Sequence, residues 1–206
     1  MSAKFISFEG IEGAGKSTQI DCAASLIAAQ GFSVDTTREP GGTLFAEQIR
    51  ELILTPTTET VAPMSELLLM FAARAQHLEQ RIKPALDGGS WVLCDRFTDA
   101  SFAYQSGGRG MPWSDIEQLE TLVQGSLRPH RVLVFDLPVE VGLARAAARH
   151  AQPDRFETER GEFFERVRAA YLRRASAAPA RYCVIDASAS VAEVSEQIEL
   201  ELSQLW

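Results

Sequence analysis

A glycine-rich segment near the start of the chain constrains the fold more than any other feature. Residues 10–17 read Gly-Ile-Glu-Gly-Ala-Gly-Lys-Ser, which fits the phosphate-loop pattern G-x-x-x-x-G-K-[ST] at every fixed position. A short apolar run at 4–8 precedes the segment and an amphipathic stretch at 16–29 follows it, as a buried strand and a helix would. In that context, backbone N–H groups and the positive end of the new helix surround an anion. The chain is therefore predicted to bind a nucleoside triphosphate.

Individual positions of this loop have expected roles. Lys16 should reach the β- and γ-phosphates, and the Ser17 hydroxyl should coordinate Mg²⁺. The chain has only three lysines among its 20 basic residues, and one of them stands where the loop requires it. A glycine-rich turn that matches by chance is the alternative, and the flanking strand and helix patterns argue against it. We expect the nucleotide to contact Gly10, Ile11, Glu12, Gly13, Ala14, Gly15, Lys16, Ser17 and Thr18.

Composition indicates an ordinary globular enzyme. A chain of 206 residues suits one domain, 1–206, that can bury a substantial core. The net charge of −8 argues against a general nucleic-acid binder, and no apolar run approaches the length of a membrane span. The chain enters a strand without a signal peptide, so we expect a cytoplasmic protein. The cysteines Cys22, Cys94 and Cys183 are expected to be buried free thiols.

Apolar runs alternate with helical patterns along the whole chain. Strands are predicted at 4–8, 32–37, 90–94, 131–135 and 181–185, and helices at 16–29, 43–54, 64–86, 115–125, 139–148, 160–176 and 191–203. Such alternation predicts an α/β fold, with a central parallel sheet of about five strands flanked by helices. Ligands of these sheets bind at the carboxyl ends of the strands. The polar segments 9–17, 38–43 and 95–97 follow three of the predicted strands, which indicates one shared site.

The residues around the aspartates that end two of the predicted strands favour phosphoryl transfer over hydrolysis. A GTPase needs an [NT]-K-x-D segment, and none of the three lysines follows Asn or Thr. Two apolar runs end in aspartate, Asp95 and Asp136, and either could be the magnesium-side carboxylate. We favour Asp95 because charged residues surround it, whereas Asp136 precedes Leu-Pro and could end a strand or cap a helix. An arginine follows Asp95 directly, as suits a second, phosphorylated substrate.

Arginines crowd the segment that follows Asp136. Arg145 and Arg149 are four residues apart and share a helix face, and Arg155 and Arg160 follow an interruption. One interpretation is a solvated helix surface with an exposed loop. We favour a lid at about 145–160 that brings arginines to the transferring phosphate and excludes water.

Six short segments together resemble the bacterial thymidylate kinases over essentially the whole chain. Their order and spacing carry the resemblance: Phe8–Thr18, Arg38–Thr43, Phe71–His77, Asp95–Phe97, Ser101–Gln105 and Asp154–Glu157. The resemblance implies a P-loop kinase fold, ATP as phosphate donor, dTMP as acceptor, Mg²⁺ and a homodimer. The phosphate loop carries no arginine while the lid carries several. This is similar to the subgroup in which the catalytic arginine comes from the lid.

The resemblance also implies roles on the phosphate side of the acceptor. Arg38 and Arg96 would hold the acceptor monophosphate, and Asp95 would lie near magnesium. Glu12 would accept from the ribose 3′-hydroxyl. Arg149 and Arg155 are the expected catalytic lid arginines, together with Lys16 of the loop.

On the base side, Arg74 would donate to the 4-oxo group of thymine. Arginine has only donors, so it would reject cytosine, which presents an amino group there. Phe71 would stack on the base, Tyr104 would crowd the sugar 2′ side, and Ser101 and Gln105 would line the base pocket.

Two other functions stay open from the sequence. One is a related kinase that acts on another nucleoside monophosphate or on a nucleoside. The other is a nucleotide-binding regulatory module without transferase activity, which the many arginines argue against. His77, His130 and His150 have no evident catalytic partner, and we expect surface or structural positions for them.

Overall fold

The computed structural model describes residues 3–148, 155–156, 159 and 161–206. Its centre is a five-stranded parallel sheet with the order β2-β3-β1-β4-β5. The strands are β1 Phe5–Gly10, β2 Val34–Arg38, β3 Trp91–Asp95, β4 Arg131–Asp136 and β5 Tyr182–Asp186. The α/β class and the parallel sheet are thus confirmed.

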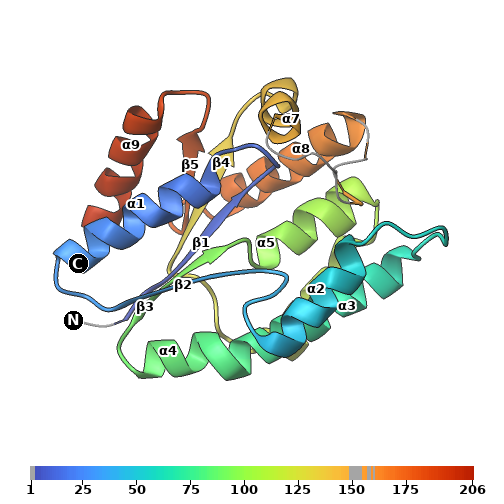
Figure 1. The fold of residues 1–206 in the computed structure, drawn as a ribbon, viewed down its shortest axis with the longest axis horizontal. Coiled ribbons are helices and arrows are strands. Elements are labelled where there is room, and N and C mark those ends of the chain that lie inside the picture. Colours follow the sequence, from blue (N-terminus) through green and yellow to red (C-terminus); the bar gives the residue numbers. More distant parts are fainter. Residues whose placement is uncertain (1–2, 149–154, 157–158, 160) are drawn as a thin grey trace.

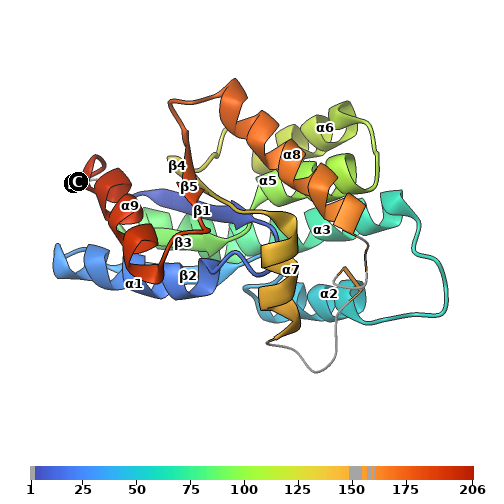
Figure 2. The same cartoon turned by 90° about the horizontal axis from the view of Figure 1, so that it is seen from above.

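Helices cover both faces of the sheet. The helical elements are α1 Lys16–Ala29, α2 Leu44–Leu54, α3 Pro63–His77, η1 Leu78–Ile82, α4 Lys83–Asp87, α5 Thr98–Ser101, η2 Phe102–Gly108, α6 Trp113–Gln124, α7 Val139–Ala147, α8 Gly161–Ala177 and α9 Val191–Ser203. Helices α1 and α9 pack on one face, and α4, α5 and α8 pack on the other (Figure 1). Helices α2, α3 and α7 lie on the side where the strands end (Figure 2).

The strand register brings the polar segments to one edge. Arg38 pairs with Asp95, and Phe8, two residues before the end of β1, pairs with Asp95 on the other side. Because all strands are parallel, their carboxyl ends meet at the same edge, as expected for a ligand site. The prediction that segments 9–17, 38–43 and 95–97 converge is confirmed by this register.

Two helical predictions differ from the structure. The stretch predicted as one helix at 64–86 is α3, a π-helical turn η1, and α4. The segment 98–108 is helical, as α5 and η2, although no helix is predicted there. Its small and polar residues lack an apolar period, and tertiary packing supplies the reason for the helix. A Cβ at Gly107 would come within 2.8 Å of Ala170 on α8, and one at Gly108 within 2.4 Å of Phe163, so these glycines permit a close helix–helix contact.

The cysteine prediction is correct for one residue of three. All three thiols are free, but only Cys94 is buried, while Cys22 and Cys183 are partly exposed. Cys22 sits on α1 and Cys183 on β5, whose side chains alternate between core and surface. Among the described helices, none is long and apolar enough to cross a membrane.

Candidate active site

The phosphate loop joins β1 to α1 and has the backbone that its glycines predict. Gly10, Gly13 and Gly15 all have positive φ angles, of 141°, 75° and 83°. A Cβ on Gly13 would lie 1.9 Å from the carbonyl oxygen of Gly142 on α7, so only glycine fits there. Helix α1 begins at Lys16, and its first N–H groups therefore face the loop. This arrangement suits the binding of a phosphate group.

Lys16 is held inside the loop. Its side chain is buried, and Nζ donates to the carbonyl oxygens of Gly10 at 3.3 Å and Ile11 at 3.0 Å. Burial lowers the pKa of Lys16 and nearby Arg96 lowers it further, whereas Asp95 and Glu12 act in the opposite direction. An anion bound in the loop would therefore supply the countercharge that this ammonium lacks.

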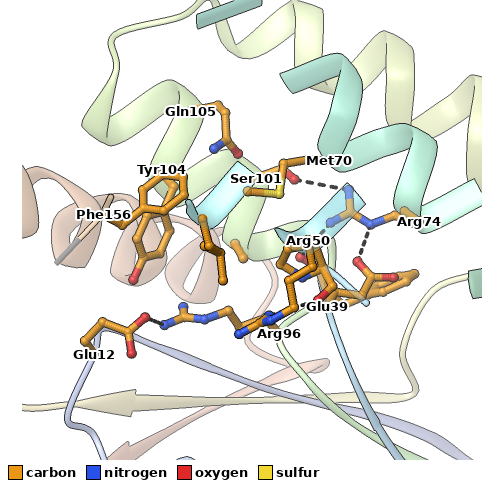
Figure 3. A pocket seen from close by; sticks show the side chains of 14 residues that line it. Glu12, Glu39, Arg50, Met70, Arg74, Arg96, Ser101, Tyr104, Gln105 and Phe156 are labelled. Carbon is orange, nitrogen blue, oxygen red and sulfur yellow. Dashed lines mark hydrogen bonds and ion pairs between the residues drawn. The ribbon is translucent and has the colours of Figure 1, made fainter. Parts of the chain in front are cut away.

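A cavity of about 70 Å³ opens beside the loop, between α2, α3, α5 and η2 (Figure 3). It is lined by six of the residues predicted to bind the acceptor, together with others. The lining residues are Glu12, Glu39, Pro40, Arg50, Leu54, Met70, Arg74, Arg96, Phe97, Ala100, Ser101, Tyr104, Gln105 and Phe156. The structure thus brings together six residues that were expected around one acceptor: Glu12, Arg74, Arg96, Ser101, Tyr104 and Gln105.

Arg74 is fixed on one wall of this cavity. Its Nε donates to Glu39 Oε2 at 2.7 Å, and its terminal nitrogens donate to Ser101 Oγ and the Phe97 carbonyl oxygen, both at 3.1 Å. The guanidinium also lies 4.6 Å from the centre of the Phe71 ring. A guanidinium has five N–H groups, so three bonds leave two donors for a ligand.

Arg96 connects the cavity to the phosphate loop. Its terminal nitrogens donate to the Gly10 carbonyl oxygen at 2.7 Å and to Glu12, and the guanidinium lies 4.9 Å from the Tyr104 ring centre. Its backbone has φ 65°, a left-handed conformation that is costly for a residue with a Cβ. Buried Glu9 stabilises this turn, because its Oε1 accepts from the Phe97 N–H at 2.7 Å.

The environment of Glu9 has an electrostatic consequence. The pKa of Glu9 is raised to about 8, first by burial and then by the nearby charge of Asp99, although Arg96 and the Phe97 N–H act in the opposite direction. Glu9 is therefore protonated over much of the neutral pH range.

Phe71, which is predicted to stack on the base, is not among the described residues that line this cavity. Its ring is buried with Leu67, Phe102 and Ile116, and the described lining residues include Met70 in its place. Phe71 and Met70 precede Arg74 by three and four residues, so helical spacing alone allows either one to share its face. The thioether of Met70 points into the cavity beside Ser101 and Arg74 (Figure 3).

A second hollow is lined in part by Asp95. It is lined by Ser17, Arg38, Asp95 and Glu47, among others, and has a volume of about 280 Å³. Arg38 donates to Glu47 at 2.9 Å and is half exposed. Arg38 therefore lines this hollow and not the cavity that holds Arg96, although the two were expected to share one phosphate.

Asp95 is also the better of the two candidate metal carboxylates. Asp136 is engaged by Arg168, with two bonds of 2.6 and 2.9 Å. Asp95 has a buried Oδ1 that no hydrogen bond from the described residues satisfies.

Of the four arginines of the predicted lid segment, Arg149 and Arg160 lie outside the described residues. Arg145 donates to the carbonyl oxygen of Ala187 at 2.9 Å. Arg155 lies against α2 and α3, where it donates to the Ile53 carbonyl oxygen at 2.9 Å and to Glu66 Oε2 at 2.6 Å.

Two histidines have structural partners, as expected. His77 is buried between Thr37 and Glu39, and His130 Nδ1 accepts from the Phe5 N–H. His150 lies outside the described residues.

Sequence analysis missed several polar and aromatic residues of the cavity. Glu39, Arg50 and Phe156 line it and come from three different segments of the chain. Glu39 lies inside the Arg38–Thr43 segment, which carries part of the family resemblance, and that segment was the signal by which Glu39 could have been found. Nothing in the local sequence marks Arg50, which lies on α2 at a position that only the packing of α2 against α3 reveals.

Comparisons with known proteins agree with this geometry. The family model for thymidylate kinase matches residues 8–198. A thymidylate kinase of Pseudomonas putida is 59% identical over 199 residues, which cover 97% of this chain and 94% of that protein. A thymidylate kinase of Pseudomonas syringae pv. tomato is 57% identical, with 100% and 97% covered. The crystal structure of thymidylate kinase from Ehrlichia chaffeensis superposes with a TM-score of 0.79 at 32% identity, over 98% of this chain and 99% of that one.

Proposed function

The chain belongs to the thymidylate kinase family, and we propose from that membership and from the site that it transfers the γ-phosphate of ATP to dTMP. The products are ADP and dTDP. The observation that carries the proposal is the position of the Arg74 cavity directly beside the phosphate loop, with Arg96 joining the two. A phosphate donor in the loop and a thymine nucleotide in the cavity would meet at Arg96.

The acceptor cavity accounts for the base and the sugar. The two remaining donors of Arg74 suit the 4-oxo oxygen of thymine, and Met70 covers one side of the base. Tyr104 lies on the opposite wall, held at 5.7 Å from the Phe156 ring, where it would crowd a 2′-hydroxyl. Glu12 belongs to the phosphate loop and also lines the cavity, where its carboxylate would accept from the 3′-hydroxyl of the sugar.

The transfer itself is an in-line displacement. An oxygen of the dTMP phosphate attacks the γ-phosphorus, the bond from that phosphorus to its bridging oxygen breaks, and ADP leaves. Lys16 and the N–H groups of the loop hold the donor, while Arg96 and a lid arginine balance the charge that spreads over the γ-phosphate oxygens. Arg38 would approach the phosphates from the neighbouring hollow.

Ser17 and Asp95 fit a magnesium ion. They line the same hollow, and the buried Oδ1 of Asp95 lacks a hydrogen-bond partner in the described structure. Among described residues no cluster of three or more acidic, His or Cys side chains exists that could hold a metal. That suits Mg²⁺, which keeps waters and nucleotide oxygens as most of its ligands. When bound, the ion would neutralise charge on the phosphates.

We also propose that the chain is one domain with a lid at about 145–160 and that it forms a homodimer. Its α2–α3 surface leaves large apolar side chains exposed, at Leu44, Phe45, Leu52, Met64 and Leu68. Such a patch is typical of a protein interface, and sedimentation equilibrium would distinguish a dimer from a monomer. The three free thiols fit a reducing compartment, and we place the enzyme in the cytoplasm.

An acceptor panel tests the proposed activity. Formation of ADP is followed with ATP and Mg²⁺ against dTMP, dUMP, dCMP, AMP and thymidine. Preference for dTMP is the expected result. Preference for another acceptor would keep the phosphate-loop chemistry and overturn the thymine assignment, whereas ATP binding without transfer would indicate a regulatory module.

A further inference from the structure

Gln105 presents one end of an amide to the base cavity, and which end it presents decides what it can recognise. The amide oxygen accepts and the amide nitrogen donates, and the two ends have nearly the same shape. Gln105 enters the cavity from η2, across from Arg74 (Figure 3). Its side chain is only 1% exposed, so its hydrogen bonds must come from the protein or from a bound ligand.

A buried carboxylate fixes this orientation. Gln105 Nε2 donates to Glu66 Oε1 at 2.9 Å, and Glu66 is also 1% exposed. An ionised carboxylate only accepts hydrogen bonds, so the reversed amide would place two acceptors against each other. The amide oxygen of Gln105 consequently faces away from Glu66, on the side of Ser101 and Arg74 (Figure 3).

The other oxygen of Glu66 is held by arginines. Arg155 donates to Oε2 at 2.6 Å, and Arg109 lies 3.5 Å from each oxygen. These guanidiniums neutralise the charge of the buried carboxylate. They also make the two oxygens unequal, because the shortest arginine contact is at Oε2 and the Gln105 contact is at Oε1.

The same cavity therefore offers donors from Arg74 and, from across it, an acceptor from Gln105. Thymine presents the complementary pair, an accepting 4-oxo group beside the N3–H donor. Cytosine presents the reverse, a donating amino group beside an accepting N3. We propose that Glu66, which does not touch the substrate, is a positioning residue that selects thymine over cytosine by setting the amide of Gln105. This inference rests on the proposed function, since it concerns the acceptor base.

The variant Glu66→Gln makes a directional test. Arg155 requires an acceptor at the Oε2 position, so the new amide should keep its oxygen there and place its nitrogen where Oε1 was. That nitrogen can donate only to the amide oxygen of Gln105, so Gln105 must turn this oxygen toward position 66 and its own nitrogen toward the base. We expect kcat/KM for dTMP to fall about 10- to 100-fold, and the dCMP-to-dTMP ratio of kcat/KM to rise by at least about tenfold.

Two controls separate this effect from a general disturbance. Glu159→Gln changes a carboxylate that also pairs with Arg109 but makes no hydrogen bond to Gln105 in the described structure, and it should leave the ratio unchanged. In a Gln105→Ala background, Glu66→Gln should no longer alter the ratio, because the amide through which it acts is gone. A change in ratio that persists without Gln105 would overturn the proposal, as would an unchanged ratio in a folded Glu66→Gln variant.

A measurement on the wild-type protein covers the case in which Glu66→Gln does not fold. Neutron diffraction of the deuterium-exchanged enzyme with dTMP distinguishes the ND₂ end of Gln105 from its oxygen. The ND₂ group should lie on Glu66, and an ND₂ group directed at the base would overturn the proposal. Wild-type enzyme that does not prefer dTMP would contradict the proposed function itself, whereas a dTMP preference with an unchanged variant ratio contradicts only the role of Glu66.

Discussion

Replacing Arg74 by alanine should damage both stability and base selection, and the two effects can be separated. Arg74 is 2% exposed and makes three hydrogen bonds, one of them to the carboxylate of Glu39, which is 4% exposed. Removing one partner of a buried ion pair typically costs about 3–5 kcal/mol, because the other charge stays buried. Glu39 would keep only His77 among the contacts described for its side chain. We therefore expect the free energy of unfolding to fall by about 3–5 kcal/mol for Arg74→Ala.

The same variant should lose discrimination between bases. Without the donors of Arg74, the 4-oxo oxygen of dTMP loses its hydrogen-bond partner. The amino group of dCMP, which is itself a donor, no longer faces the opposing donors of Arg74. A mismatch of this kind supports large selectivity, so we expect the dTMP-to-dCMP ratio of kcat/KM to fall by at least about 100-fold. The assays are urea denaturation followed by circular dichroism, and ADP release with each monophosphate.

A second substitution separates the two effects. Adding Glu39→Gln to Arg74→Ala removes the unpaired charge and should recover about 1–3 kcal/mol of stability without restoring base selection. Wild-type stability in the single variant would refute the importance of the buried pair. A lowered stability with an unchanged dTMP-to-dCMP ratio would show that the base is recognised elsewhere.

Three further variants test other parts of the site. Lys16→Ala should lower kcat at least about 100-fold with little change in melting temperature, since Nζ donates to two carbonyl oxygens and to no other group among the described residues. Near-normal turnover would contradict its role. Met70→Ala should mainly raise KM for dTMP, whereas Phe71→Ala should destabilise the fold by about 3–5 kcal/mol, as measured by denaturation. Native Glu9 keeps its proton to about pH 8, but an exposed carboxyl loses it near 4.5, so wild-type stability should fall as pH rises from 5 to 8. Glu9→Gln should remove much of that decline, and parallel pH curves for the two proteins would contradict the assignment.

The phosphate loop could be predicted from sequence because backbone geometry leaves few alternatives there. A Cβ on Gly13 would collide with Gly142, and the φ angle of Gly13 is positive, so this position requires glycine. A glycine in the sequence at this position therefore indicates the backbone conformation of the loop. The central strands β1, β3 and β4 could be predicted for a similar reason, since strands buried on both faces must be almost wholly apolar. These constraints are local, and a single sequence contains them.

The cavity wall could be predicted only in part because it depends on how helices are rotated against each other. Met70 and Phe71 are adjacent on α3, and both lie near the face of Arg74. The packing of α3 against α6 and η2 places Phe71 with Phe102 and Ile116, and this leaves Met70 to the cavity. Similarly, the helix at 98–108 depends on α8, which lies about sixty residues later in the chain. No local pattern contains either relation.

The contacts of Arg155 bear on which lid arginine reaches the transferring phosphate. Arg155 is tied to Glu66 and to the Ile53 carbonyl oxygen, and its own N–H donates to the Leu54 carbonyl oxygen. Moving its guanidinium to the phosphates would break a short bond to a carboxylate that is 1% exposed. Breaking such a pair is costly unless another cation takes its place, and Arg109 is 3.5 Å away. A role for Arg155 in holding Glu66, and through it the base cavity, needs no such exchange. The phosphate role therefore suits Arg149 better of the two expected lid arginines.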